Sequence, residues 1–545
     1  MTCSSQGRGA RTRASHVETR LDTCSTHQGQ APARVPAWHA RVRAPQWPAL
    51  VCVFSVIGFA AETGSSLIDA VKSGDRAAVR RLAQQPALVN TPGPDGTSAL
   101  HWAVRAGDLA MVKLLLTAGA DPNAANRYGV TPLSLAAENS SAPNSKTLVE
   151  TLLNAGADPK GPTILMTAAH AGNPDVVRLL AARGANVNQT EPTRGETALM
   201  WAASENHPEA IQVLIEHGVD PNARSTTLTF PKDRFGLEGV VTVLPRGGWT
   251  ALMYAARQGS LEAARALAEA GANLDLADPD GTTAMVLAII NGHFDTAALL
   301  AEKGADPNLA DSTGMAALYA AADMSTLGEI YGRPARPSTS RVSVLDLIRI
   351  LLQHGADPNA ALKSATLYRA HTPGETTLGE GTTPFLRAAK NGDVSTLRVL
   401  LESGADSARV QKNGTTALML ASGVGRGQGV FAKDYATEAE LLSAVQFLVE
   451  HGADVNAVND TGQTALHIAA QASDGIVDYL AAHGANLDTK DKQGRTALDI
   501  AMGVGVRARL GGESTVRGST AALLRQWMDR QARSAASSPV PADFR

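Results

Sequence analysis

GTSALHWAVRAGDLAMVKLLLTAGADPN, residues 96–123, contains the signals of two short consecutive helices. A glycine turn opens the stretch and the short helical segment ALHWAV follows it. Apolar residues then recur at helical spacing, at Met111, Val112 and Leu115, which predicts a second helix. Gly119 comes directly after that helix, where a left-handed glycine commonly ends one. The stretch therefore predicts one helix–turn–helix unit.

The same unit recurs along the chain. Its opening returns as GVTPLSLAA at residues 129–137 and as GQTALHIAA at 462–470, where a threonine can cap the first helix. Its end, the motif G-A-D/N-x-N/D or a near equivalent, has its glycine at Gly119, Gly156, Gly184, Gly218, Gly271, Gly304, Gly355, Gly404, Gly452 and Gly484. These glycines are about 33 residues apart, or that distance plus an insertion of roughly 15 to 20 residues, and such a period predicts a solenoid.

At these residues the chain resembles the ankyrin-repeat family. The resemblance implies a mainly α solenoid of about twelve helix-turn-helix units with short β-hairpin finger loops, within residues 62–530. An N-terminal cap is expected near residues 65–90 and a C-terminal cap from 491 to about 530, followed by a disordered tail at 531–545. In the family, the histidine of the helix-opening motif bonds loop backbone, and the resemblance implies this role for His101 and His467.

Four insertions interrupt the period. Those near residues 225–247 and 360–381 lengthen the connection between units, and those near 323–343 and 423–438 lengthen the turn between the two helices of a unit. The first kind is expected at the finger edge and the second at the opposite edge. Within residues 225–247, the runs TTLTF and VVTVL are rich in β-branched residues and predict a protruding hairpin.

Residues 1–61 are expected to be a disordered leader that ends in a signal peptide. Arg41 and Arg43 precede an apolar run at residues 48–61, and Gly58 and Ala60 fit the small side chains of a cleavage site. An uncleaved anchor and a buried or disordered segment are the alternatives. All three cysteines lie before residue 61. We therefore expect a periplasmic or secreted bacterial protein without a stable membrane span after cleavage, and the arrangement also resembles exported bacterial ankyrin-repeat proteins.

Candidate binding residues follow from the family resemblance, because ankyrin partners usually bind the concave side. The expected turn tips are Arg127, Tyr128, Arg194 and Trp249, and the exposed ends of first helices are Arg105, His170, Arg257 and Lys390. Arginine and aromatic side chains make good interface anchors, although the alternative for each is an ordinary solvated residue. Trp102, Trp201 and Tyr254 occupy the inner-helix packing position and are expected in the core.

The sequence indicates a binding protein and no enzyme. No zinc-protease, serine-hydrolase or phosphate-loop motif is present, and no cofactor or metal is expected. The glycine run at residues 423–429 is either a flexible loop or an anion site. After residue 61 the chain holds 42 basic and 50 acidic residues, which disfavours nucleic acid as a partner. A non-catalytic scaffold for a protein partner is the leading prediction, and a small-ligand or glycan receptor that uses the finger-edge insertions is the alternative. The oligomeric state is left open.

Overall fold

The computed structural model describes residues 66–139, 144–161, 163–229, 246–325, 340–366, 377–424, 436–505 and 516–537. The chain divides into two units, Met1–Thr63 and Gly64–Arg545, and only the second contains described residues. The expected leader and signal peptide therefore lie outside the described residues.

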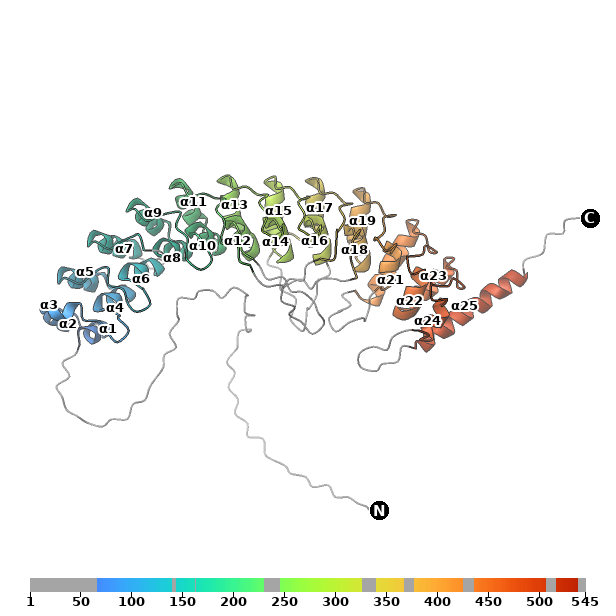
Figure 1. Ribbon diagram of the computed structural model, residues 1–545, viewed down its shortest axis with the longest axis horizontal. Coiled ribbons are helices and arrows are strands. Elements are labelled where there is room, and N and C mark those ends of the chain that lie inside the picture. The colour runs from blue at the N-terminus through green and yellow to red at the C-terminus, as the bar shows by residue number, and fades with distance from the viewer. Residues whose placement is uncertain are drawn as a thin grey trace, which may run out of the picture. The chain divides into compact units, whose positions relative to one another are not determined.

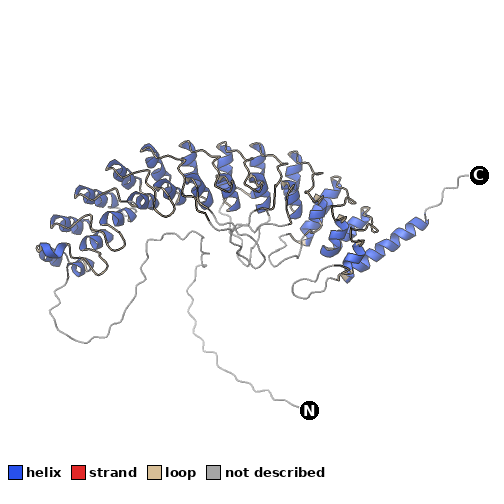
Figure 2. Cartoon of the chain, viewed as in Figure 1, coloured by secondary structure: helices blue, strands red, loops and turns tan. Residues whose placement is uncertain are grey.

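Twelve consecutive helix pairs build the second unit, which confirms the predicted mainly α solenoid (Figures 1 and 2). The first helices of units 1 to 12 are α1 (Leu67–Lys72), α4 (Ala99–Arg105), α6 (Pro132–Glu138), α8 (Ile164–Ala171), α10 (Ala198–Ser204), α12 (Ala251–Gln258), α14 (Ala284–Ile290), α16 (Ala317–Met324), α18 (Pro384–Lys390), α20 (Ala417–Ala421), α22 (Ala465–Ala472) and α24 (Ala497–Ala501). The second helices are α2 (Arg76–Leu82), α5 (Leu109–Thr117), α7 (Ser145–Asn154), α9 (Pro174–Ala182), α11 (Pro208–Glu216), α13 (Leu261–Glu269), α15 (Phe294–Glu302), α17 (Val344–Gln353), α19 (Val394–Glu402), α21 (Glu438–Glu450), α23 (Asp474–Ala482) and α25 (Gly518–Ser537). The short helix α3 (Pro86–Val89) joins units 1 and 2.

Local signals place the helix ends as predicted. Thr131 caps α6, because its hydroxyl accepts a hydrogen bond from the Ser134 amide at 3.2 Å, and Pro132 occupies the first turn. Gly119 follows α5 with φ +90°, and a Cβ atom there would meet nothing within 4 Å. Glycine is therefore favoured at this helix end by its backbone conformation and not by lack of space.

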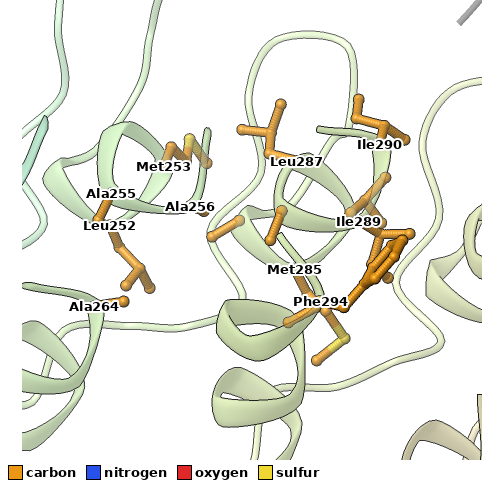
Figure 3. Packing of buried hydrophobic residues seen from close by; sticks show 14 of the residues in the cluster. Leu252, Met253, Ala255, Ala256, Ala264, Met285, Leu287, Ile289, Ile290 and Phe294 are labelled. Atoms are coloured by element: carbon orange, nitrogen blue, oxygen red, sulfur yellow. The ribbon is translucent and has the colours of Figure 1, made fainter. Parts of the chain in front are cut away.

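Small and branched residues alternate in the core. In each inner unit the first helix packs against the first helices on both sides, as α10 does against α8 and α12. Ala255 and Ala256 of α12 are fully buried and let α14 approach, while Met285 and Ile289 of α14 fill the space beside them (Figure 3). Burying a side chain of this size contributes roughly 1.5–3 kcal/mol, so each unit gains stability chiefly from its neighbours.

The finger loops are tight turns without paired strands among the described residues, so the expected short β-hairpins are only partly formed. In the finger before α6, the Asn126 amide donates to Val130 O at 3.0 Å and the Gly129 amide donates to Asn126 O at 2.9 Å. The only bridges recorded in the described part are Thr190 with Thr197, Thr227 with Gly247 and Ala277 with Thr283. A turn closed after four residues leaves too few residues for a longer ladder.

Neighbouring units are also tied by a ladder of asparagine side chains behind the fingers. Asn308 of unit 7 donates from Nδ2 to Gly355 O at 2.9 Å, and its Oδ1 accepts from the Asp357 amide at 2.7 Å. The same pair of hydrogen bonds to the next unit is made by four further asparagines: Asn90, Asn123, Asn359 and Asn456. Lys160 and Ala408 hold the equivalent positions after units 3 and 9, so the ladder is interrupted at these two joints.

The described ends of the insertions lie at the predicted edges. Residues 225–228 pair with 246–249 at the finger edge, because the Ser225 amide donates to Trp249 O and the Leu228 amide donates to Arg246 O. The run at 240–244 lies outside the described residues, so the upper hairpin stays a prediction. Ser340 and Arg341, at the end of another insertion, bond the turn between α14 and α15 at the opposite edge.

Helix α25 continues to Ser537, past residue 530 where the tail was expected to begin. It packs against α23 and α24, and Trp527 Nε1 donates to Asp478 at 2.8 Å, which extends the last unit. Within the ranges described, no helix is long and apolar enough to cross a bilayer.

Candidate functional site

The inner surface of the solenoid is built from two rows of side chains on the first helices. In units 2 to 10, the concave row holds the residue three positions after the helix start, and the helix-end row holds the residue three positions later. In unit 1 the helix-end position is that of Lys72, two residues before Gly74 as Arg105 is before Gly107. The concave row of units 2 to 10 comprises Trp102, Leu135, Thr167, Trp201, Tyr254, Leu287, Ala320, Arg387 and Leu420. The helix-end row of units 1 to 9 comprises Lys72, Arg105, Glu138, His170, Ser204, Arg257, Ile290, Asp323 and Lys390.

The concave row changes from open to covered along the chain. Its five residues in units 2 to 6 are all half-buried. The four residues in units 7 to 10 are between 0% and 5% exposed. Trp102, Trp201 and Tyr254 were expected in the core, and each instead packs on one side and leaves part of its ring open. Among units 2 to 10, units 2 to 6 therefore present the concave row to a partner.

Lys390 belongs to the covered part. Its Nζ donates to Val424 O at 3.2 Å and to the Thr377 hydroxyl, and both partners are ends of insertions. Leu378 beside Thr377 is fully buried. Lys390 was expected to be exposed at its helix end, and the structure shows it half-buried instead, because these chain segments lie against it.

Trp102 lies between two cations at the N-terminal end of the open part. Lys72 Nζ is 4.3 Å from the indole centre, and the Arg105 guanidinium carbon is 5.6 Å from it. Both cationic residues are exposed, as predicted for Arg105. A cation over an indole ring is attracted by the ring quadrupole, which holds both side chains near Trp102.

His170 and Trp201 form a second cluster in units 4 and 5. The two rings meet edge to face with centres 5.5 Å apart. His170 Nε2 lies 3.6 Å from a carboxylate oxygen of Glu205, and about half of the His170 side chain is exposed. His170 thus stands at its helix end as predicted, beside an aromatic ring and an acid.

Trp249 is not at a turn tip: the sequence prediction is wrong for this residue. It is only 3% exposed and packs edge to face against Tyr254, at 5.5 Å between ring centres. Trp249 directly precedes Thr250, the N-cap of α12, so its side chain turns back into the core. Arg257 was expected to be exposed at its helix end, but it is half-buried, because it lies 5.3 Å from the Trp249 ring.

Tyr254 and Arg194 meet at Glu196. Tyr254 Oη donates to Glu196 Oε1 at 2.9 Å, and Arg194 lies 3.8 Å from the same oxygen. Burial first, and the Glu196 charge second, raise the pKa of the Tyr254 hydroxyl, which keeps it a neutral donor. Arg194 is therefore half-buried at its finger and paired with Glu196.

Arg127 and Tyr128 form the most exposed of the predicted fingertips. Tyr128 is 49% exposed, and Arg127 lies 4.8 Å over its ring and donates to its hydroxyl at 2.5 Å. The pair lies at the tip of the finger before α6, whereas the helix-end row lies at the other end of the first helices. The candidates thus form a rim group and a helix-end group along the solenoid and not one compact site.

His101 and His467 have the structural role that the family resemblance implied. His101 Nδ1 accepts from the Ser98 amide at 3.2 Å, and Nε2 donates to Val130 O at 3.0 Å. His467 makes the same contacts with Thr464 and Arg495 O. Burial lowers the pKa of both rings, against the backbone bonds that favour the charged form. Both rings are therefore neutral, and each links its own helix start to the backbone of the next unit.

A buried ion pair was missed by the sequence analysis. Arg387 of the concave row is 3% exposed, and its Nε lies 2.6 Å from an oxygen of Asp323, which stands in the helix-end row of the preceding unit. An arginine at a position that is otherwise apolar or small was the available signal. Among the described residues, no group of three or more His, Cys, Asp or Glu side chains could hold a metal ion.

Comparisons with known proteins agree with this architecture. A family model described as ankyrin repeats (3 copies) matches residues 67–160, 140–225, 237–311, 344–430 and 434–506, which is more than half of the chain. A second model, ankyrin repeats (many copies), matches residues 199–268. The crystal structure of the human ASB11 ankyrin repeat domain is 27% identical, with a TM-score of 0.34, and covers 41% of this chain and 91% of that chain.

Two curated relatives match short stretches. A transient receptor potential cation channel subfamily A member 1 homolog from Caenorhabditis elegans is 35% identical over 130 residues, 23% of this chain and 11% of that protein. Notch-regulated ankyrin repeat-containing protein A from Danio rerio is 42% identical over 73 residues, 13% of this chain and 65% of that protein. Both are eukaryotic proteins, so they support the repeat type and give no support to an exported bacterial group. Ankyrin repeats indicate a protein–protein interaction scaffold.

Proposed function

This chain belongs to the ankyrin-repeat family, and we propose that it is a non-catalytic scaffold that binds a protein partner on the concave face of units 2 to 6. The observation that carries the proposal is the half-exposed concave row, which includes Trp102, Trp201 and Tyr254. Large aromatic side chains that are already held on one side bury much area on binding and lose little rotamer freedom. The same row is covered in units 7 to 10, so units 2 to 6 hold the longest run of open positions, which supports a partner site there.

The length of the open surface favours a polypeptide over a small molecule. Five packed units at roughly 10 Å each extend over about 50 Å. Arg105, His170 and Arg257 of the helix-end row flank this surface, and Arg127, Tyr128 and Arg194 lie along its finger rim. A hollow of about 440 Å³ is lined by residues of α17 and α19, including Arg349 and Glu402. It lies on the second helices, away from these candidates.

We also propose that the protein acts outside the cytoplasm of a bacterium. Support comes from Arg41 and Arg43 before the apolar run 48–61, and from the absence of cysteine after Cys52. Mass spectrometry of the mature N-terminus tests this location. A start near residues 61 to 63 agrees with export, and an intact Met1 contradicts it.

Site-specific crosslinking in intact cells tests the scaffold. A photoreactive residue in place of Leu135, in the open concave row, should capture a defined partner. The matched control replaces Lys113, which is exposed on the second helix α5 in the neighbouring unit. Capture from both positions of the same abundant proteins, or from neither position, contradicts the proposal.

A receptor for a small ligand or glycan, built on the finger-edge insertions, predicts a different result. Such a ligand stabilises the folded chain by mass action, so thermal-shift screening against envelope glycans and metabolites would find it. The scaffold predicts no hit in that screen and a specific crosslink at residue 135.

A further inference from the structure

Lys72 and Arg105 bring two positive charges to one indole ring. Lys72 Nζ lies 4.3 Å and the Arg105 guanidinium carbon 5.6 Å from the Trp102 ring centre, at the N-terminal end of the open concave row. In the described part of the chain, neither cation forms an ion pair. We call these three residues the Trp102 clamp. Two like charges near one ring favour a nearby anion, since a counterion lowers their mutual repulsion.

The nearby charges leave the clamp positive. Arg76 is paired with Asp108 at 2.9 Å. Asp69 lies one turn before Lys72 on α1, is exposed, and keeps its negative charge while it accepts a hydrogen bond from the Ser66 hydroxyl at 2.6 Å. Glu138, exposed at the helix end of unit 3, is the next charge along the row. The two clamp cations outweigh the single charge of Asp69, so an acidic group is favoured beside Trp102 and disfavoured directly over unit 3.

Apolar surface continues from the clamp. Leu135 is half-buried in unit 3, and the Trp201 ring is half-buried in unit 5 beside His170. From unit 1 to unit 5 the distance is about 40 Å at roughly 10 Å per unit. An extended chain covers that distance with about 12 residues at 3.3 Å each.

We propose that the Trp102 clamp is the anchor for a carboxylate in an extended segment of the partner protein, and that apolar side chains of this segment continue over Leu135 to Trp201. The segment is acidic where it meets units 1 and 2 and carries no acid over Glu138. This inference rests on the proposed scaffold function and specifies the chemistry of its partner.

Peptide selection tests the inference without knowledge of the natural partner. The probe is a random 12-residue peptide library, selected on the full chain, and the enriched peptides are measured by fluorescence anisotropy. Peptides rich in Asp or Glu together with Leu or aromatic residues are expected. Their affinity should fall as salt is raised, because the clamp cations are exposed and therefore screened.

Matched variants locate the binding. Lys72→Ala/Arg105→Ala should weaken the selected peptides about three- to tenfold, and Trp102→Ala should weaken them more than about tenfold. The control Arg80→Ala/Lys113→Ala removes the same charge from exposed second-helix positions of the same two units and should change affinity less than about twofold. The charge variant keeps the indole, so it tests the clamp even if Trp102→Ala disturbs folding.

Three results overturn the inference. They are enrichment of basic or uncharged peptides, equal binding by the clamp variant and its control, and no enrichment at all. The crosslink from residue 135 distinguishes these results from failure of the proposed function. A specific protein crosslink together with any of them leaves the scaffold standing and rejects only the acidic segment.

Discussion

Asn308→Ala should weaken the joint between units 7 and 8 without touching the core. The Asn308 side chain makes two hydrogen bonds to unit 8, to Gly355 O at 2.9 Å and from the Asp357 amide at 2.7 Å. It is exposed, and the neighbouring core helices keep all their contacts in the variant. The substitution therefore isolates the ladder from hydrophobic packing.

The magnitude follows from the number of bonds and their exposure. A hydrogen bond contributes about 0.5–1.5 kcal/mol net, and water can replace part of an exposed one. Two exposed bonds predict a loss of about 1–2 kcal/mol for Asn308→Ala. Asn308→Asp keeps the acceptor and loses the donor, so it should cost about half as much. Asp275 already serves as such an acceptor, for the Asp306 amide at 2.8 Å.

The chain also offers the reverse experiment. Ala408 stands where the ladder asparagine belongs and has no group that can hydrogen-bond from its side chain. Ala408→Asn should gain about 1 kcal/mol at the joint between units 9 and 10 by reaching Gly452 O and the Asp454 amide.

Urea unfolding and hydrogen exchange provide the assay. Equilibrium unfolding followed by circular dichroism gives the shift in midpoint, and exchange of the Asp357 amide reports the joint itself. The reasoning is refuted if Asn308→Ala and Asn308→Asp unfold with the same midpoint as the parent chain. A neutral Ala408→Asn together with a destabilised Asn308→Ala would show instead that only part of the ladder contributes.

Three further predictions follow from described contacts. His101 and His467 are held neutral with lowered pKa values, so their contribution to stability is complete above about pH 6.5, the usual unfolded value, and is lost as the pH falls below it. Replacing both histidines by Gln should make the urea midpoint depend less on pH between about pH 7 and 5. An unchanged pH dependence would show that other groups cause it. Asp323→Ala leaves the Arg387 charge buried without this partner, so it should lower the free energy of unfolding in urea by about 3 kcal/mol. Replacing both residues by Leu should lower it by less. Equal losses in the two variants would argue against a stabilising pair. Exchanging residues 230–245 for an Asn-Gly turn should leave the thermal midpoint unchanged and weaken crosslinking from residue 135; full capture would make this insertion irrelevant to binding.

The periodic part of the fold was predictable because it depends on local signals. Gly119 and Thr131 each set a helix end through their own backbone or hydroxyl, and these effects act within a few residues. Trp249 was misplaced although a signal existed. It stands between the finger glycine and the helix cap, and the equivalent residues Thr282 and Thr382 are also buried.

The division of the concave face was beyond sequence reasoning. Leu135 and Leu287 occupy the same position of their units and are chemically identical, yet one is half-buried and the other is 5% exposed. Burial on this inner surface depends on contacts with other chain segments, as Lys390 shows through its bonds to Thr377 and Val424. A period of about 33 residues carries no information on such contacts, because insertions do not follow it.

The insertions change the surface without changing the frame. In several uninterrupted joints, the backbone of one finger donates to the residue before the finger glycine of the preceding unit, as Arg127 N does to Asp95 O at 3.0 Å. The two finger-edge insertions keep this bond, from Thr226 N to Arg194 O at 2.6 Å and from Lys363 N to Thr313 O at 2.8 Å. Each insertion therefore begins only after the joint is complete, and its length adds little to the cost of closing the loop. Stability then remains a matter of nearest neighbours, while the binding face is free to differ from one half of the array to the other.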